Sequence, residues 1–575
     1  MLRRIFSYMK EYKKYAWLAL ICIGVEVVLE IMVPKLMADL IDIGVTNSDV
    51  PYIINKGIQM AVCAVAALIL GVGSARFSAL AGQGLGANIR KAEYEKLQSY
   101  SFSNIDHFSV SSLVTRLTSD VTNIQNAVST GMRPFGRSPV MLIFATTLAF
   151  KINSTLALVF LVALPVLAVL LIIIIINVGP RYGRMQGAVD LVNRCIEENL
   201  TAVRVVKSYV RGDYEIEKFR NVNDNLKNES EKAFGIAVLN MPAMQFVMYS
   251  TILGILLIGG RLINSGQMMI GQLTSFLSYV LLILNSLMMM SNVFLLMTRS
   301  LASAERIMKV IDEPIDITDE NARNIEVKKG EIEFNHVWFK YNETAKEYVL
   351  SDVSFHINAG QTVGIIGQTG SSKTTLIQLI PRLYDASKGE IKIDGINVKE
   401  YPVRHLRDAI SVVLQKNTLF SGSLIDNLRW GNENATLDEI KEACSIACVD
   451  EFIDRLPGGF DAEMGQEGVN VSGGQKQRIC IARAILKKPK VLILDDSTSA
   501  VDTATEGKIR NALAKKLPDM TKIIIAQRIS SVCHADQIII MDGGCVNAIG
   551  THESLLRTNK IYQEIYESQK EGADL

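Results

Sequence analysis

"TVGIIGQTGSSKTTLIQLI", residues 362–380, decides the fold of the second half of the chain. A short apolar run of strand type leads into a loop of small residues, and the loop leads into a helical segment. This order lets backbone N–H groups of the loop and the start of the helix surround phosphate groups. The ammonium group of Lys373 can then reach the outer phosphates, and the hydroxyl of Thr374 can bind Mg²⁺. The stretch therefore predicts a phosphate-binding loop in an α/β domain.

One position of this loop departs from the usual pattern. The expected phosphate contacts are the loop and the first helical turn: Gly367, Gln368, Thr369, Gly370, Ser371, Ser372, Lys373, Thr374 and Thr375. A glycine usually precedes the lysine, and Ser372 stands there instead. Its Cβ crowds the phosphates, and a left-handed backbone at this residue would cost about 1–2 kcal/mol.

A second stretch, "VLILDDSTSAVD" at 491–502, contains two adjacent carboxylates. Four apolar residues have the pattern of a buried strand and run directly into Asp495 and Asp496. A carboxylate at the end of a buried strand is suited to hold Mg²⁺, because this ion prefers oxygen ligands. The residues alone leave open whether the second carboxylate is a catalyst or a substitute for one.

The chain outside these motifs divides into regions of different character. At 575 residues it is too long for one ordinary domain. From about residue 327 short apolar strands alternate with helices, whereas "IDEPIDITDENARN" at 311–324 is charged, contains proline and is typical of a linker. We predict a transmembrane domain over 1–310, a linker over 311–326 and a nucleotide-binding domain over 327–575.

The first region contains nearly all of the long apolar runs. Six segments approach or exceed the roughly 20 apolar residues that cross a bilayer as a helix. They cover about 17–41, 59–80, 138–150, 155–178, 236–263 and 270–297. An even number of spans places both chain ends on the same side of the membrane. The basic residues near the start put that side in the cytoplasm: Arg3, Arg4, Lys10, Lys13 and Lys14.

Two charged stretches with a helical period, about 86–134 and 181–233, are too polar for lipid. We expect them to continue the membrane helices into the cytoplasm. Within them, "SSLVTRLTSDVTNIQ" and "VRGDYEIEKF" are candidate segments for contact with a cytoplasmic domain. Solvated helix faces are the alternative interpretation.

Ionisable residues inside the predicted spans are costly and invite a functional explanation. Glu26 and Glu30 lie one helical turn apart, and Arg76 lies in the next span at a similar depth. One hypothesis is that the glutamates attract cationic substrates. The alternative is a neutralising pair with Arg76 or with a partner chain.

Overall composition excludes some classes of protein. The net charge of +1 lacks the basic excess expected of a nucleic-acid-binding chain, so no nucleic-acid partner is predicted. The 8 cysteines are scattered and show no metal-ligand spacing. No cleavable signal is expected, because the first apolar segment is long and lacks a small-residue cleavage site.

"VSGGQKQRICIARAIL", residues 471–486, resembles the signature motif of the ATP-binding cassette (ABC) proteins. "VWFKY" ends in Tyr341, which is similar to the aromatic residue that stacks on adenine in this family. Gln415 matches the Q-loop, which senses magnesium, and "SAVD" resembles the D-loop and ends at Asp502. The resemblance implies ATP and Mg²⁺ as cofactors. It adds Ser472, Gly473, Gly474 and Gln475 to the nucleotide contacts and sets the metal ligands as Thr374, Gln415 and Asp495.

Six spans followed by one cassette resemble the half-transporters of ABC exporters over essentially the whole chain. This implies an α-helical transmembrane domain with long cytoplasmic helical extensions, followed by an α/β P-loop ATP-binding cassette domain. In that family the two candidate contact segments fall in the coupling-helix regions.

Two further residues depart from the family pattern in the catalytic machinery. The glutamate that polarises the attacking water is replaced by Asp496, which is one CH₂ shorter. Misplacement by about 1 Å can cost on the order of 100-fold, and loss of general-base assistance about 10²- to 10⁴-fold. The switch histidine is replaced by Gln527, which can hydrogen-bond but cannot carry a proton at neutral pH. The signature motif, by contrast, is intact.

This combination resembles the degenerate-site subunit of bacterial heterodimeric multidrug exporters. It implies ATP hydrolysis coupled to transport of amphipathic compounds, with catalysis mainly where the signature meets the Walker motifs of a second half-transporter. It also implies a bacterial plasma membrane, contact with lipid and cytoplasmic termini. The alternatives are a homodimeric lipid or peptide exporter with slow ATPase, and an ATP-gated regulator that barely hydrolyses ATP.

Overall fold

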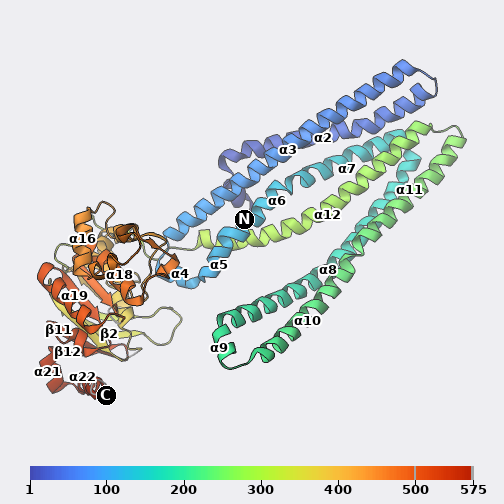
Figure 1. Ribbon diagram of the computed structural model, residues 1–575. Helices are drawn as coiled ribbons and strands as arrows, with labels where there is room; N and C mark the ends of the chain where they lie inside the picture. The colour runs from blue at the N-terminus through green and yellow to red at the C-terminus, as the bar shows by residue number, and fades with distance from the viewer. Residues whose placement is uncertain (369, 498–499, 572–575) are drawn as a thin grey trace. The chain divides into compact units, whose positions relative to one another are not determined.

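A computed structural model describes residues 1–368, 370–497 and 500–571 of the chain. The structure divides into two compact units (Figure 1). The first consists of Met1–Gln98 and Val110–Glu313, and the second of Ser99–Ser109 and Pro314–Leu575. The chain passes from one unit to the other within the predicted linker. The second unit also takes up a short segment from the first half of the sequence.

The first unit is built from helices, several of them far longer than a bilayer is thick (Figure 1). The long ones are α2 (Lys13–Asp39), α3 (Val50–Gln98), α7 (Met132–Ile152), α8 (Ser154–Thr201), α10 (Gly212–Ala237), α11 (Asn240–Asn264) and α12 (Ile270–Asp312). The short ones are α1 (Leu2–Ser7), α5 (Val110–Thr115), α6 (Val121–Ser129) and α9 (Val203–Ser208). Helices suit these apolar sequences because a helix satisfies its backbone hydrogen bonds within one segment, as lipid requires.

Five stretches of the described residues are long and apolar enough to cross a bilayer: Lys10–Val45, Val50–Gln98, Val110–Ile152, Gly212–Asn264 and Ile270–Met290. The remaining predicted span, 155–178, lies in α8, where the apolar helical part found is the shorter Ser154–Leu167. The start of α8 is fixed by Asn153, whose side chain accepts hydrogen bonds from two backbone N–H groups. The predicted helical transmembrane architecture is confirmed, and the sixth span stays a prediction.

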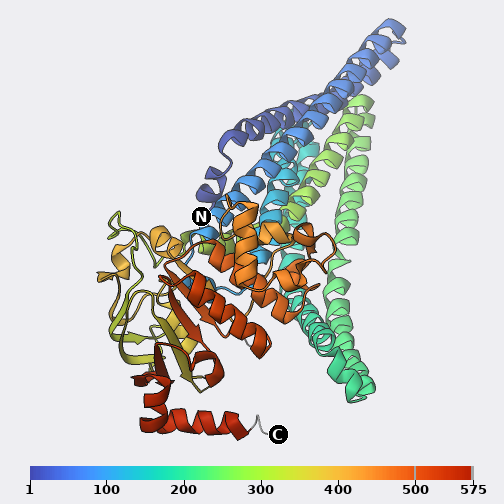
Figure 2. The ribbon, with the colours of Figure 1, turned by 60° about the vertical axis from the view of Figure 1, so that its left-hand side comes forward.

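Helix α12 contacts α2, α6, α7 and α11 within the first unit. Figure 2 shows this unit from a second direction. The buried Tyr279 donates a hydrogen bond to the carbonyl oxygen of Ile31 on α2, at 2.9 Å. The rings of Phe276 and Phe160 on α8 stack with their centres 5.4 Å apart. Apolar burial and one satisfied buried hydroxyl therefore hold α12 against α2 and α8.

The second unit contains a six-stranded sheet in the order β12-β11-β3-β10-β9-β6. Its strands are β3 (Thr362–Gly367), β6 (Ile410–Val413), β9 (Val491–Asp495), β10 (Thr521–Ile525), β11 (Gln537–Asp542) and β12 (Cys545–Gly550). All neighbours are parallel except the edge pair β11 and β12. In a parallel sheet the carboxyl ends of the strands lie on one edge, where ligands usually bind.

Two smaller sheets complete the strands of this unit. An antiparallel sheet in the order β2-β1-β4-β5 is formed by β1 (Ile332–Phe339), β2 (Leu350–Ile357), β4 (Lys388–Ile393) and β5 (Ile396–Asn397). The pair β7 (Gly422–Ser423) and β8 (Glu463–Met464) forms the other. The predicted α/β domain is therefore confirmed, with an antiparallel layer added to the parallel sheet.

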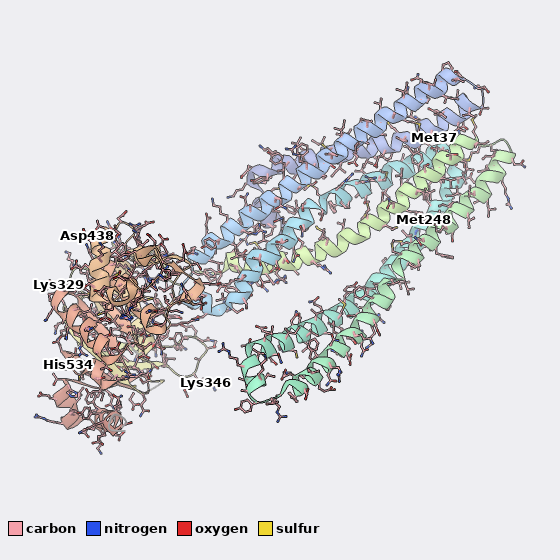
Figure 3. The ribbon with its side chains drawn as sticks, viewed as in Figure 1. Met37, Met248, Lys329, Lys346, Asp438 and His534 are labelled. Atoms are coloured by element: carbon pink, nitrogen blue, oxygen red, sulfur yellow. The ribbon has the colours of Figure 1, made fainter. Side chains whose placement is uncertain are left out.

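The helices of this unit are mostly short. They are α4 (Phe102–His107), α13 (Lys373–Gln378), α14 (Val403–Asp408), α15 (Leu424–Arg429), α16 (Leu437–Ile446), α17 (Asp450–Ile453), α18 (Gly473–Leu486), α19 (Thr503–Lys516), α20 (Ile529–Val532), α21 (His552–Thr558) and α22 (Lys560–Glu571). The apolar face of α18 shares a buried core with α15 and α16. Asp438 lies at the outer surface of α16 (Figure 3). Cys444 and Cys448 are both buried in this core, where they pack among apolar side chains.

Candidate functional site

The phosphate loop lies between the end of β3 and the start of α13, as predicted. The Nζ atom of Lys373 donates to the carbonyl oxygens of Gly367 and Gln368, at 2.8 and 2.9 Å. Burial lowers the pKa of Lys373, although Asp495 and Asp496 act in the opposite direction. An anion among the loop N–H groups would offset this desolvation cost and fits the site electrostatically. The predicted contact Thr369 lies outside the described residues.

Ser372 adopts the left-handed conformation, with φ +66° and ψ 24°. For a residue with a Cβ, the left-handed backbone costs roughly 1–2 kcal/mol relative to the right-handed helical one. Ser372 therefore bears the cost that the sequence predicted for a left-handed residue at this position. Nearby Gly370 also has a positive φ, +86°, and among the described residues beyond its chain neighbours no atom lies within 4 Å of a Cβ built there. The loop therefore contains one left-handed residue that glycine accommodates and one where serine bears strain.

Asp495 and Thr374 lie close enough to share a metal ion. The hydroxyl of Thr374 donates to Oδ1 of Asp495 at 3.3 Å. The Asp495 side chain is 1% exposed, and among the described residues its Oδ2 has no hydrogen-bond partner. Burial raises the pKa of this carboxyl group. A buried carboxylate oxygen without a partner, beside a hydroxyl, fits a Mg²⁺ site, because the cation would satisfy that oxygen.

Asp496 forms a small network with two glutamines. The parallel strands β10 and β9 are aligned so that Ile525 lies opposite Asp495. The residues that follow these two strands therefore meet at the carboxyl-terminal edge of the sheet. There, Oδ2 of Asp496 accepts hydrogen bonds from Nε2 of Gln527 at 2.9 Å and of Gln415 at 3.4 Å. Asp496 itself has a positive φ of +47°. The structure thus brings together the three predicted residues and directs both amides to the short carboxylate.

Tyr341 is held as a partly exposed aromatic platform. Its hydroxyl is 2.9 Å from Oγ1 of Thr375 and donates to Gln378 at 3.2 Å. Its ring meets the rings of Phe339 and Tyr384 edge-on, at 4.9 and 5.1 Å. The side chain remains 47% exposed, which leaves area for stacking on a nucleobase.

Tyr384 also contacts the segment that the second unit takes from the first half of the chain. Its hydroxyl donates to Asp106 of α4 at 2.6 Å, and Phe102 packs on its ring. Burial and this hydrogen bond raise the pKa of Tyr384 well above its usual range. Asn104 adds a 2.8 Å hydrogen bond to the carbonyl oxygen of Pro314. This segment precedes the candidate contact segment at 111–125, and sequence reasoning missed it.

The signature residues begin a different helix, α18. Ser472 caps this helix: its Oγ accepts a hydrogen bond from the backbone N–H of Gln475, at 3.3 Å, and Gln475 reciprocates at 2.9 Å. Ser472 and Gly473 are exposed. Asp502 caps α19 in the same way through the N–H of Thr505. The start of the signature helix and Asp502 are therefore each fixed by a cap, and Ser472 and Gly473 face solvent in this chain. Ser499, the first residue of the predicted D-loop, lies outside the described residues.

Gln569 of α22 also contacts the site, although no motif in the sequence marks it. Its amide donates to the carbonyl oxygen of Gln527 at 2.7 Å and accepts from the N–H of Ile529 at 2.8 Å. The last described helix therefore fixes the backbone on both sides of Arg528, next to the amide that binds Asp496.

Within the first unit, Glu26 and Glu30 are paired with arginines of α7. Arg133 lies 2.6 Å from Glu26, and Arg137 lies 3.4 Å from Glu26 and 2.7 Å from Glu30. The prediction of Arg76 as the neutralising residue is wrong: it is exposed, and none of the ion pairs among the described residues includes it. The number of residues along the second span suggests how deep Arg76 lies in the membrane, but it does not show in which direction the side chain points.

Comparisons with known proteins agree with this architecture. A profile described as the ABC transporter transmembrane region matches residues 16–287, and one described as ABC transporter matches 350–499. An uncharacterized ABC transporter ATP-binding protein of Bacillus subtilis, YfiB, is 38% identical over 575 residues, which is 100% of both chains. An ATP-dependent lipid A-core flippase of Desulfotalea psychrophila is 32% identical over 85% of both chains.

A solved structure of a bacterial Atm1-family ABC exporter with ATP bound has the same fold. It matches with a TM-score of 0.84 and 22% identity, over 97% of this chain and 99% of that one. Family profiles on both units and a full-length relative together identify the chain as a multi-pass membrane protein that binds ATP and belongs to the ABC transporters of exporter type.

Proposed function

We propose that this chain is one half of a heterodimeric exporter that moves amphipathic or hydrophobic compounds, including drugs, out of a bacterial cell. The observation that carries the proposal is the 2.9 Å contact between Asp496 and Gln527. Two residues expected to perform the chemistry of hydrolysis are instead bonded to each other. An intact signature beside this impaired site points to a partner chain with a competent one.

The contact weakens catalysis for two physical reasons. The amide of Gln527 donates to Oδ2 of Asp496 and so occupies an oxygen that would otherwise accept a hydrogen bond from the attacking water. Gln527, as an amide, offers no proton exchange at neutral pH. Bound ATP and Mg²⁺ would supply the phosphate charge and the bond whose hydrolysis drives transport. Lys373 would bind the phosphates and Asp495 with Thr374 would hold the metal, so binding is retained while hydrolysis is slow.

The signature residues would act at the other site of the dimer. Ser472 and Gly473 are exposed at the start of α18, where backbone N–H groups favour anions. In the family, signature residues meet the phosphates held by the partner's Walker motifs. Hydrolysis there would reset the transporter, and nucleotide at this chain's own site would act mainly as a clamp. Both termini would lie in the cytoplasm.

A lipid substrate is the second candidate. It is favoured by the relative named as a lipid A-core flippase. Such an exporter could work as a homodimer with slow ATPase at two identical sites. The two candidates differ in whether the chain hydrolyses ATP and transports substrate without a second half-transporter.

The discriminating experiment is to purify the full-length chain alone and together with the product of an adjacent half-transporter gene. ATPase and substrate-stimulated transport are then measured in vesicles. We expect slow ATP turnover from this chain alone and fast, stimulated turnover from the pair. Robust ATPase from this chain alone would defeat the heterodimer proposal, and ATP binding with no transport by either preparation would favour a regulator.

A further inference from the structure

Four charged side chains of α2 and α7 form an alternating chain in the order Arg133, Glu26, Arg137, Glu30. Its inner members each contact two opposite charges, and its end members each contact one. Glu26 is 3% exposed and Arg137 18%, whereas Glu30 is 27% and Arg133 41% exposed. The two ends therefore retain accessible charge of opposite sign.

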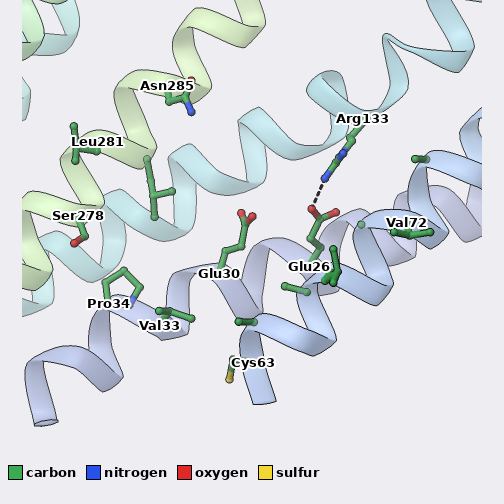
Figure 4. Close-up of a pocket in the computed structure, with 16 residues that line it drawn as sticks. Glu26, Glu30, Val33, Pro34, Cys63, Val72, Arg133, Ser278, Leu281 and Asn285 are labelled. Carbon is green, nitrogen blue, oxygen red and sulfur yellow. Dashed lines mark hydrogen bonds and ion pairs between the residues drawn. The ribbon is translucent and has the colours of Figure 1, made fainter. Parts of the chain in front are cut away.

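These ends line a cavity of about 820 Å³ in the first unit (Figure 4). Glu26, Glu30 and Arg133 belong to its wall, and Arg137 does not. Among the described residues, Oε2 of the buried Glu26 has no hydrogen-bond partner, so a carboxylate oxygen in this wall is unsatisfied. Leaving a buried charged oxygen unpaired is costly, and such a group in a membrane domain is a candidate ligand contact.

The rest of the wall is mostly apolar. The α3 side contributes small and aliphatic residues such as Ala64, Ala67, Leu68 and Val72, and α12 contributes Leu281. Ser278 and Asn285 of α12 add two polar groups. The volume and the mixture of an apolar wall with a few polar groups are typical of small-molecule sites.

We propose that this cavity binds a zwitterionic amphiphile: an apolar body that carries an ammonium group and a phosphate or carboxylate at one end. The ammonium group would donate to Glu30 and to the unsatisfied oxygen of Glu26. The anionic group would accept from the accessible edge of Arg133. Glu26 and Glu30 are one turn apart, about 6 Å along the helix, a distance that one ammonium group can bridge with two of its N–H donors.

Charge balance favours this ligand over a simple cation. The four side chains sum to zero, so a cation gains no net attraction from the cluster as a whole. A zwitterion satisfies both ends at once and leaves neither charge unpaired in a low-dielectric environment. The inference rests on the proposed export function, because it names the chemical class of the substrate, and it replaces the cation hypothesis drawn from the glutamates alone.

The test measures dissociation constants for full-length protein in detergent micelles by native mass spectrometry. Three single-chain probes of equal chain length are compared: lysophosphatidylethanolamine, an alkylamine and an alkyl phosphate. We expect the zwitterion to bind about tenfold tighter than either singly charged probe. Glu30→Gln should shift the preference toward the alkyl phosphate, and Arg133→Gln toward the alkylamine. An apolar tripeptide with free ends distinguishes a water-soluble source of the zwitterion from a lipid.

Lys35→Gln is the matched control, because Lys35 is exposed on α2 and is not part of the cavity wall. If a single variant fails to fold, the double variant Glu26→Gln/Arg133→Gln removes one charge of each sign and should abolish the zwitterion preference without creating another. Equal affinities for the three probes, or an equal loss for all probes in the variants, would overturn the inference. Preferential binding without transport by the heterodimer would count against the export function alone.

Discussion

Replacing Asp496 by glutamate should raise ATP turnover at this chain's own Walker site, and the size of the gain should depend on Gln527. The longer side chain advances the carboxylate by about 1 Å or more, toward the position from which the family glutamate polarises water. While Gln527 remains, its amide competes with the attacking water for a carboxylate oxygen at position 496. In the wild-type chain this amide lies 2.9 Å from Oδ2 of Asp496. A hydrogen bond to a charged group contributes about 1.5–3 kcal/mol, equivalent to roughly 10- to 100-fold in rate.

We therefore expect about a tenfold gain from Asp496→Glu alone, and about 10³-fold when Gln527→His is added, within the range of general-base catalysis. The assay is ADP formation by the full-length chain paired with a partner whose own Walker lysine is replaced, so that only this chain's site turns over. Asp438→Glu, an exposed carboxylate on α16, is the control for the chemical change itself.

A double-mutant cycle gives the result that would refute this reasoning. If the two substitutions contribute additively, the contact between the residues at 496 and 527 is not what restrains hydrolysis. If neither change raises turnover, the strained Ser372 or the partner's signature is limiting, and the account based on reach and amide contact fails.

Three further predictions concern the second unit. Burial acts to raise the pKa of Asp394, but hydrogen bonds from four backbone N–H groups outweigh burial and place this pKa below its usual range. The ionised carboxylate therefore stabilises the folded state fully above the unfolded-state pKa, and this stabilisation is lost as pH falls through the folded-state pKa. Asp394→Asn should thus lower unfolding stability by about 2 kcal/mol at pH 7, with the difference from wild type closing in acid, as urea titrations of the full chain at several pH values would show. Tyr384→Phe removes the 2.6 Å hydrogen bond to Asp106, and should leave ATP affinity unchanged but weaken substrate stimulation of the heterodimer ATPase about tenfold. Gly474→Ala would place a Cβ 2.7 Å from the carbonyl oxygen of Ala500, so the backbone must shift, and ATPase at the composite site should fall about 100-fold with the melting temperature nearly unchanged.

Local sequence was sufficient for the parts of the site whose geometry is local. The order of strand, loop and helix at 362–380 and the carboxylate after a buried strand each predict their structure over a few residues. The sequence showed the departure at Ser372, but that its backbone is left-handed was a condition which only the structure met. The contact of Asp496 with Gln527 needed the sheet, because only the alignment of β9 and β10 brings these residues together.

Longer-range partners were beyond sequence reasoning for a geometric reason. Periodicity along one helix shows which residues share a face, but not which face the next helix presents. Arg133 and Arg137 lie more than 100 positions after the glutamates they neutralise, so depth counting selected Arg76 instead. Gln569 likewise sits on an amphipathic helix where its position carries no signal of a contact with Gln527.

The residues of the second unit separate binding from chemistry. Tyr341 keeps its exposed ring, and the Tyr384 ring that supports it also holds Asp106 of the segment taken from the first half of the chain. Nucleotide occupancy would therefore act on an aromatic pair joined to that segment whether or not hydrolysis follows. The departures from the family pattern lie on the phosphate side, at Ser372 and in the contact of Asp496 with its amides. A site altered in this way can still pass the effect of bound ATP to that segment, which is what the proposed clamp requires.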